Sequence, residues 1–163
     1  MTRARRPGPS RASLREELLA LLTADLDAME KAQRATVEGA THAEARAEDD
    51  KDTRALEQTY LARGQAARVE QLRDAVAQVH TMPLDGAGDA VTLGSLVTAE
   101  HDDGGLVVWI APQGGGKRLA GSAVQVVTPQ SPLGAALLGR RVGDECELRV
   151  AGKLRVLNIL SVR

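Results

Sequence analysis

One stretch of the sequence constrains the fold more than any other, because apolar residues recur in it every three or four positions. The residues of this stripe are Leu14, Leu18, Leu22, Leu26 and Met29. This spacing places them on one face of an amphipathic helix. Ser13, with Glu16 three residues later, has the form of a capping box. We therefore expect a helix that begins at Ser13 and ends near Gly39, since glycine is favoured just past a helix C-terminus.

A second helical pattern begins near residues 49–52 and is stopped by Pro83, which cannot continue a helix. Its apolar side carries Leu56, Tyr60, Val69, Leu72, Val76 and Val79. Two long helices with a short polar connection are typical of an antiparallel hairpin. We predict an antiparallel coiled-coil hairpin over residues 13–82. A disordered basic arm over residues 1–12, which hold four arginines, is expected to precede it.

After a linker rich in Gly and Asp at residues 83–90, the pattern changes from helical periods to short β-type runs. The candidate strands are residues 91–99, 106–111, 123–128, 145–150 and 154–160. One short helix interrupts them, with Ser131 as N-cap, Pro132 as first helical residue and Gly139 at its end. The fold class is therefore α+β: a helical hairpin followed by a small β-sheet domain with one helix, residues 91–163.

The composition excludes several classes of function. The chain has 21 basic and 22 acidic side chains, so bulk charge does not make it a polyanion binder. Aromatic residues make up only 1%, too few for a platform that stacks bases. We find no apolar run long enough to span a membrane and no signal-peptide core behind the N-terminal arginines. The single cysteine, Cys146, fits a reducing compartment, and we expect a cytoplasmic protein.

Common catalytic and cofactor motifs are weak in this chain. The run Gly114–Lys117 does not complete a phosphate-binding loop, because Ala111 stands where the motif needs Gly and Arg118 where it needs Ser or Thr. We interpret the run as a hairpin turn. Cys146 alternates into the apolar face of a strand and is expected to be a core residue. Three histidines lack metal-ligand spacing: His42, His80 and His101. We expect no cofactor that belongs to the chain itself.

The connection between the two helices is strongly acidic. Residues 38–52 hold two bases and six acids: Glu38, Glu44, Glu48, Asp49, Asp50 and Asp52. A structural explanation is available, because acids in the first turn of the second helix oppose its macrodipole. A functional explanation is also open. About 27 helical residues, at about 1.5 Å each, place this tip about 40 Å from the hairpin's base, so its carboxylates could bind Mg²⁺ inside another macromolecule.

The segment from Val127 to Asp144 carries three distinctive motifs, Ser131-Pro-Leu-Gly134, Leu138-Gly139 and Val142-Gly-Asp144. With the opening Leu14-Arg-Glu-Glu-Leu18 and the acidic tip, it resembles bacterial transcription elongation factors of the GreA/GreB type. The resemblance covers residues 13–163. It implies an FKBP-like C-terminal domain that docks at the secondary channel of RNA polymerase. It also implies that the hairpin enters this channel and that the polymerase's own active site then cleaves the 3′ end of backtracked RNA, so the chain is not itself an enzyme.

The resemblance also assigns roles to residues. Tip acids would act on Mg²⁺ shared with the polymerase, but the family's Gly-Asp-x-x-Glu-Asn motif is absent here. Asp49 and Asp52 keep its three-residue spacing and are the expected catalytic and metal-binding residues. The alternates are Glu48, Asp50 and Glu44. The polymerase would bind around the Ser131–Asp144 segment. The expected partner-binding residues are Ser131, Pro132, Leu133 and Gly134.

The missing tip motif keeps a second function open, a regulator that occupies the secondary channel and inhibits without promoting cleavage. A prolyl isomerase is disfavoured, because such pockets are lined by aromatic residues and Trp109 is the only one in the C-terminal half. Trp109 stands among aliphatic residues and is itself expected in the core. A coiled coil that pairs between chains is a further alternative to the monomer that we expect.

Overall fold

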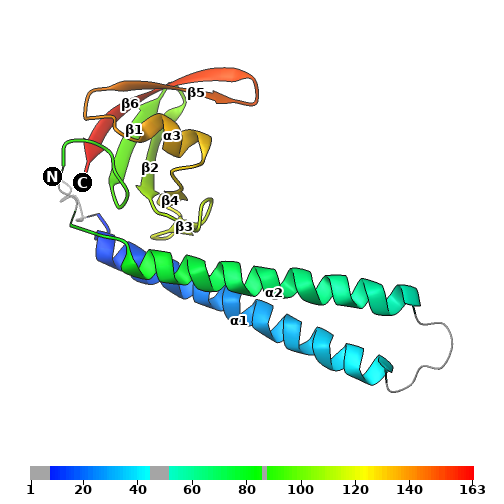
Figure 1. Ribbon diagram of the computed structural model, residues 1–163. Helices are drawn as coiled ribbons and strands as arrows, with labels where there is room; N and C mark the ends of the chain where they lie inside the picture. Colours follow the sequence, from blue (N-terminus) through cyan, green and yellow to red (C-terminus); the bar gives the residue numbers. More distant parts are fainter. Residues whose placement is uncertain (1–7, 45–51, 86–87) are drawn as a thin grey trace. The chain divides into compact units, whose positions relative to one another are not determined.

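The computed structural model describes residues 8–44, 52–85 and 88–163 (Figure 1). The chain divides into two compact units. The first combines Met1–Leu19 with Gln78–Arg163, and the second is Ala20–Ala77. Within the described ranges, no helix is both long enough and apolar enough to cross a membrane. The predicted architecture is confirmed: two long N-terminal helices precede a six-stranded sheet with one short helix.

The first helix, α1, spans Arg11–Glu44 and differs from the prediction at both ends. Ser10, not Ser13, caps it: the Ser10 hydroxyl oxygen accepts the Ser13 N–H at 3.0 Å, which satisfies one of the free donors of the first turn. The helix also continues past Gly39, because that residue does not adopt the positive φ of a helix-ending glycine.

The second helix, α2, spans Asp52–Thr81 and runs antiparallel to α1 (Figure 1). The two helices are linked by an ion pair of 2.8 Å between Arg73 and Glu30. Buried residues of the hairpin unit are apolar and comprise Leu22, Val69, Leu72 and Ala75.

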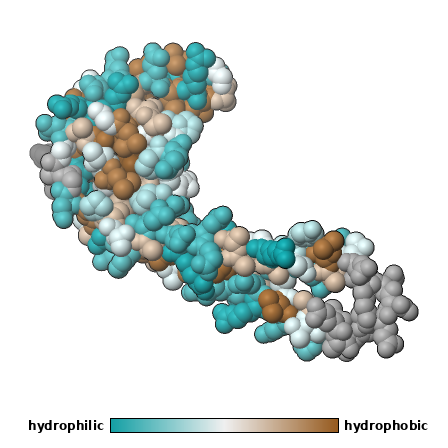
Figure 2. Space-filling view, viewed as in Figure 1, coloured by the Kyte–Doolittle hydropathy of each residue, from teal (hydrophilic) through white to brown (hydrophobic). Residues whose placement is uncertain are grey.

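Two residues predicted on the apolar side of α2 do not pack there. Leu56 is 54% exposed and Tyr60 is 62% exposed. Counting back from Val69 in helical steps leads instead to three half-buried positions, Gln65, Ala62 and Gln58. The prediction was wrong because the sequence pattern does not show which side of α2 is buried. In this part of the helix, the half-buried positions do not include the large apolar residues Leu56 and Tyr60. Figure 2 shows that apolar side chains reach the surface on both helices in this part of the hairpin.

The sheet has the strand order β3-β4-β2-β1-β6-β5. Its strands are β1 Leu96–His101, β2 Gly104–Ile110, β3 Arg118–Leu119, β4 Val124–Val127, β5 Glu145–Val150 and β6 Lys153–Val162. All neighbouring pairs are antiparallel except β2 and β4, which are parallel. The short helix α3, Pro132–Leu137, lies between β4 and β5 in the chain.

Three details of the sheet differ from the predicted strands. The first strand begins only at Leu96, because Gly94 adopts a positive φ of 89° in the preceding turn. The two-residue strand β3 was not predicted. The Gly114–Lys117 run closes a turn, with the Lys117 N–H donating to the Gly114 carbonyl at 3.1 Å, but it is not a hairpin between adjacent strands. Since β2 and β4 are parallel, the chain must cross over between them.

The central strands of the sheet carry buried residues on both faces. One face forms a core with α3 that includes Cys146, as predicted, and partly buried Leu133. On the other face of the sheet, Trp109 is fully buried, which confirms its predicted core position. Its indole N–H donates to the Gly94 carbonyl at 3.1 Å. The start of α1 also belongs to this unit: Leu18 is fully buried, and a Cβ added at Gly114 would lie 2.6 Å from its Cδ1.

Candidate partner-binding site

The α3 segment is built as its sequence predicts. Ser131 is the N-cap: its hydroxyl accepts the Gly134 N–H at 3.0 Å and donates to the Thr128 carbonyl at 2.8 Å. Pro132 occupies the first turn, where its missing N–H costs no hydrogen bond. Gly139 follows the helix with a positive φ of 78°, a conformation that favours glycine. These contacts hold the start of α3 against the end of β4.

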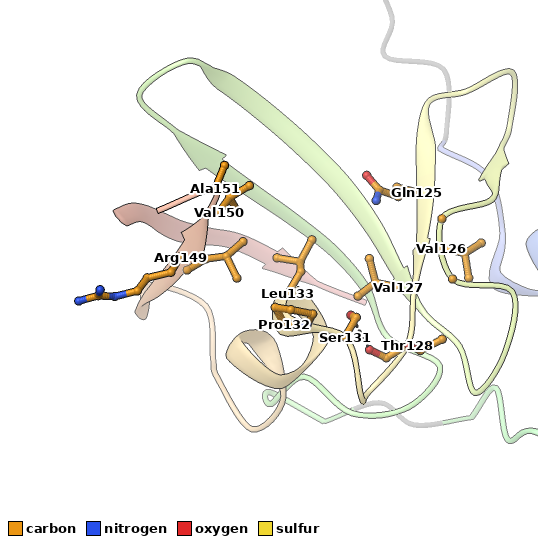
Figure 3. Close-up of a pocket in the computed structure, with 13 residues that line it drawn as sticks. Gln125, Val126, Val127, Thr128, Ser131, Pro132, Leu133, Arg149, Val150 and Ala151 are labelled. Carbon is orange, nitrogen blue, oxygen red and sulfur yellow. Dashed lines mark hydrogen bonds between the residues drawn. The ribbon is translucent and has the colours of Figure 1, made fainter. Parts of the chain in front are cut away.

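A cavity of about 650 Å³ lies between the start of α3, strand β4 and the end of the β5–β6 hairpin. Figure 3 shows its lining residues, with Leu133 on α3 facing Val127 on β4. We call this cavity the groove. The groove is lined by Gly115, Gly116, Gln125, Val126, Val127, Thr128, Ser131, Pro132, Leu133, Leu148, Arg149, Val150 and Ala151.

Three of the four predicted partner-binding residues line the groove, namely Ser131, Pro132 and Leu133. Gly134 does not. It is a buried residue of α3, and a Cβ added there would come 1.9 Å from the Thr128 carbonyl oxygen. The structure therefore gives Gly134 a packing role, which lets α3 approach the backbone at the end of β4.

The lining of the groove is mostly apolar. Most of its lining side chains are aliphatic, and its polar groups are the hydroxyls of Thr128 and Ser131 and the amide of Gln125. Among the lining residues, all of which are described, the only charged side chain is that of Arg149. A groove of this kind can receive apolar side chains, whose transfer from water is favourable. The described residues contain no group of three or more His, Cys, Asp or Glu that could hold a metal ion.

Sequence reasoning missed the groove wall contributed by β5, which consists of Leu148, Arg149 and Val150. Part of the signal was present. Alternation along 145–150 puts Leu148 and Val150 on the same face as buried Cys146. The sequence does not indicate that this face continues beyond the core to meet α3 and β4.

The predicted tip acids lie mostly outside the described residues. This holds for Glu48, Asp49 and Asp50. Glu44 is the last residue of α1 and Asp52 the first residue of α2. Both therefore stand at the ends of the hairpin helices, on either side of residues 45–51.

Cys146 and His101 were also considered as functional residues, and the structure shows what surrounds each of them. Burial raises the pKa of the Cys146 thiol above its ordinary value of 9.0, so the thiol stays protonated at neutral pH. This is the opposite of what a nucleophilic cysteine needs. His101 accepts the Asp103 N–H on Nδ1 at 3.1 Å, next to a smaller cavity of about 210 Å³.

A comparison with protein families finds a match in the C-terminal domain. Residues 86–163 match the family model described as "Transcription elongation factor, GreA/GreB, C-term". A search of curated protein sequences finds no match.

Solved structures also show similarity. GreA factor homolog 1 (Gfh1) of Thermus thermophilus is 21% identical, with a TM-score of 0.39, over 89% of this chain and 94% of that chain. Gfh1 of Thermus aquaticus is 21% identical, with a TM-score of 0.41, over 88% and 92% of the two chains. A GreA/GreB elongation factor of Nitrosomonas europaea is 21% identical, with a TM-score of 0.37, over 60% and 90%.

Proposed function

We propose that this chain, whose residues 86–163 match the C-terminal domain model of GreA/GreB transcription elongation factors, is a factor of that type, binds the secondary channel of bacterial RNA polymerase and promotes cleavage of backtracked RNA. The C-terminal domain would dock on the polymerase, and the hairpin would enter the channel. The chain would act as a monomer without a cofactor of its own and would not be an enzyme by itself. Its tip would meet the 3′ end of the nascent RNA.

The observation that carries this proposal is the groove beside α3. It lies within the segment that matches the family model, and three of the residues expected to bind the polymerase line it. An aliphatic groove that carries one charged side chain offers a surface for a protein segment rather than for a nucleotide. This supports docking of the C-terminal domain on a protein partner.

The hairpin supports the second half of the proposal. Its two helices are 34 and 30 residues long, so at about 1.5 Å per residue the described part of the longer one measures about 50 Å. A hairpin of this length can carry carboxylates deep into a partner's channel. Carboxylates are the hard oxygen ligands that Mg²⁺ prefers, and Asp49 and Asp52 are the residues that would bind it, with Glu44, Glu48 and Asp50 as alternates. Bound Mg²⁺ supplies an activated water for phosphodiester hydrolysis.

The proposal is tested on a stalled, backtracked RNA polymerase complex with end-labelled RNA and Mg²⁺. We expect shortened RNAs when the protein is added, and we expect them to disappear with the double variant Asp49→Ala/Asp52→Ala. The matched control is Asp27→Ala/Asp74→Ala, which removes two exposed carboxylates from the hairpin away from the tip. Unchanged cleavage by the tip variant would refute the residue assignment, and equal loss in the control would refute a specific role for the tip.

The absence of the Gly-Asp-x-x-Glu-Asn motif favours a second candidate function, a channel-binding regulator without cleavage activity. This function predicts no shortened RNA with the protein alone. It also predicts that the protein suppresses cleavage by an added cleavage factor, because both compete for the same channel. Strong stimulation of cleavage by the protein itself would exclude this alternative.

A further inference from the structure

The charges around the groove are distributed unevenly. Arg118 on β3 stands directly opposite Gln125 on β4, and Lys153 on β6 stands directly opposite Val150 on β5. Side chains at directly opposed positions of an antiparallel pair lie on the same face of the sheet, with Cβ atoms about 5 Å apart. Because Gln125 and Val150 line the groove, Arg118 and Lys153 both stand on its face, on two different walls. Both residues are exposed.

Two more cations stand on the β5–β6 hairpin near the groove. Arg149 lines the groove itself, and Figure 3 shows its side chain extending outward from the β5 wall. Arg155 stands opposite Leu148, another lining residue, although its guanidinium lies 3.8 Å from the Asp103 carboxylate. On the face of the groove, Arg118 and Lys153 are therefore the two cations for which no ion pair is described, in addition to the paired Arg155. Lys153 also lines the smaller cavity, together with Asp102 and Asp103.

The carboxylates of the same hairpin face the other way. Glu147 stands opposite Val156, and Glu145 stands opposite Asn158. Both alternate with Cys146, which is buried in the core on the groove's side of the strand. The hairpin thus places Lys153 and Arg155 on the face of the groove and both glutamates on the opposite face, where alternation also places the side chain of Arg149. Net charge of the whole chain, which is −1, conceals this arrangement.

We infer that the polymerase segment that fills the groove is acidic: it inserts an apolar side chain between α3 and β5 and places carboxylates against Arg118 on one wall and Lys153 on the other. This inference rests on the proposed function and adds the chemistry of the docking partner. The apolar contact supplies the burial, while complementary charge at a rim sets orientation and speeds association. Like charge at the same rim disfavours basic surfaces, including those of other factors.

The experiment measures binding of the full-length protein to core RNA polymerase at about 50 and 200 mM salt, by the association and dissociation rates. The test variants are Arg118→Glu and Lys153→Glu, one on each wall. Arg163→Glu is the matched control for charge reversal, since Arg163 is exposed in the same domain, does not line the groove and lies outside the Ser131–Asp144 segment. Glu147→Lys is the control for net charge on the opposite face. Fluorescence of buried Trp109 checks folding of every variant.

We expect each test variant to bind about fivefold more weakly at low salt, mainly through slower association and with a smaller loss of affinity on raising the salt. Both controls should stay within about twofold of the wild type. The inference would be overturned if Arg118→Glu and Lys153→Glu bound like the wild type while Leu133→Asp in the groove abolished binding. The proposed function would then still stand. Absence of wild-type binding to the polymerase would overturn both.

The experiment must also distinguish binding to the polymerase from binding to a nucleic acid. If the two reversals reduced affinity for a free RNA oligonucleotide by the same factor and left polymerase binding unchanged, the two cations would serve RNA and the inference would be overturned. Loss of polymerase binding with no measurable affinity for the oligonucleotide supports it.

Discussion

Replacing Gly134 with alanine should destabilise the C-terminal domain, although alanine is the better helix former. The added Cβ would lie 1.9 Å from the Thr128 carbonyl oxygen and 2.8 Å from its carbon. Both are backbone atoms and cannot rotate away as a flexible side chain does. The helix α3 must therefore move by more than about 1 Å to restore an ordinary contact distance near 3.5 Å.

The magnitude follows from what this movement disturbs. Overpacking of a filled site costs about 1–3 kcal/mol. The displaced helix also strains the Ser131 cap, whose bonds to Gly134 and Thr128 measure 3.0 and 2.8 Å, and a lost cap costs about 1 kcal/mol. The helix preference of alanine over glycine returns about 1 kcal/mol. The net loss is therefore about 1–3 kcal/mol, or a fall in Tm of roughly 5–15 °C for a domain of this size.

The assay is equilibrium unfolding followed by the fluorescence of Trp109, the only tryptophan, which is fully buried in this domain. Gly64→Ala is the matched control, because nothing lies within 4 Å of a Cβ at this position in α2. The control should stabilise the hairpin by up to about 1 kcal/mol, as measured by circular dichroism. A Gly134→Ala variant as stable as the wild type, or more stable, would show that the contact with Thr128 does not determine the spacing of α3.

Three further predictions concern other parts of the chain. Cys146 should react with a thiol reagent only after unfolding, and rapid labelling of the folded protein would contradict this. Because burial raises the pKa of the Cys146 thiol, its contribution to the free energy of unfolding should be present below pH 9.0. This contribution should be lost as the pH rises toward the higher pKa of the thiol in the folded protein. Arg73→Gln should leave the Tm nearly unchanged at about 0.5 M salt, because the exposed Arg73–Glu30 pair is screened there; a large fall at high salt would argue against this. Leu18→Ala should cost about 2–5 kcal/mol in chemical denaturation, since Leu18 is fully buried; a loss below about 1 kcal/mol would contradict its core role.

The elements that the sequence predicted well depend on neighbours along the chain. The 3.6-residue period identified both long helices, and Ser131, Pro132 and Gly139 identified the start and end of α3. The N-terminus of α1 was misplaced because two serines three residues apart, Ser10 and Ser13, both satisfy the cap pattern. Only the built backbone shows which hydroxyl accepts the free N–H.

The candidate site was predicted only where it coincides with such a local signal. Ser131, Pro132 and Leu133 were identified through their motif, whereas Leu148 and Val150 meet them only because β5 lies beside β6 in the sheet. The exposed Leu56 in α2 shows the same limit, since the apolar stripe does not state which positions face α1.

The sequence by itself determined the two long helices, the capped α3 and the core positions of Trp109 and Cys146, because hydrophobic period, capping and alternation act within a few residues. The tertiary structure decided the parallel pairing of β2 with β4, the groove and the separation of charge across the β5–β6 hairpin. These depend on contacts between segments far apart in the chain, and many different pairings are compatible with the same local pattern until the core is packed.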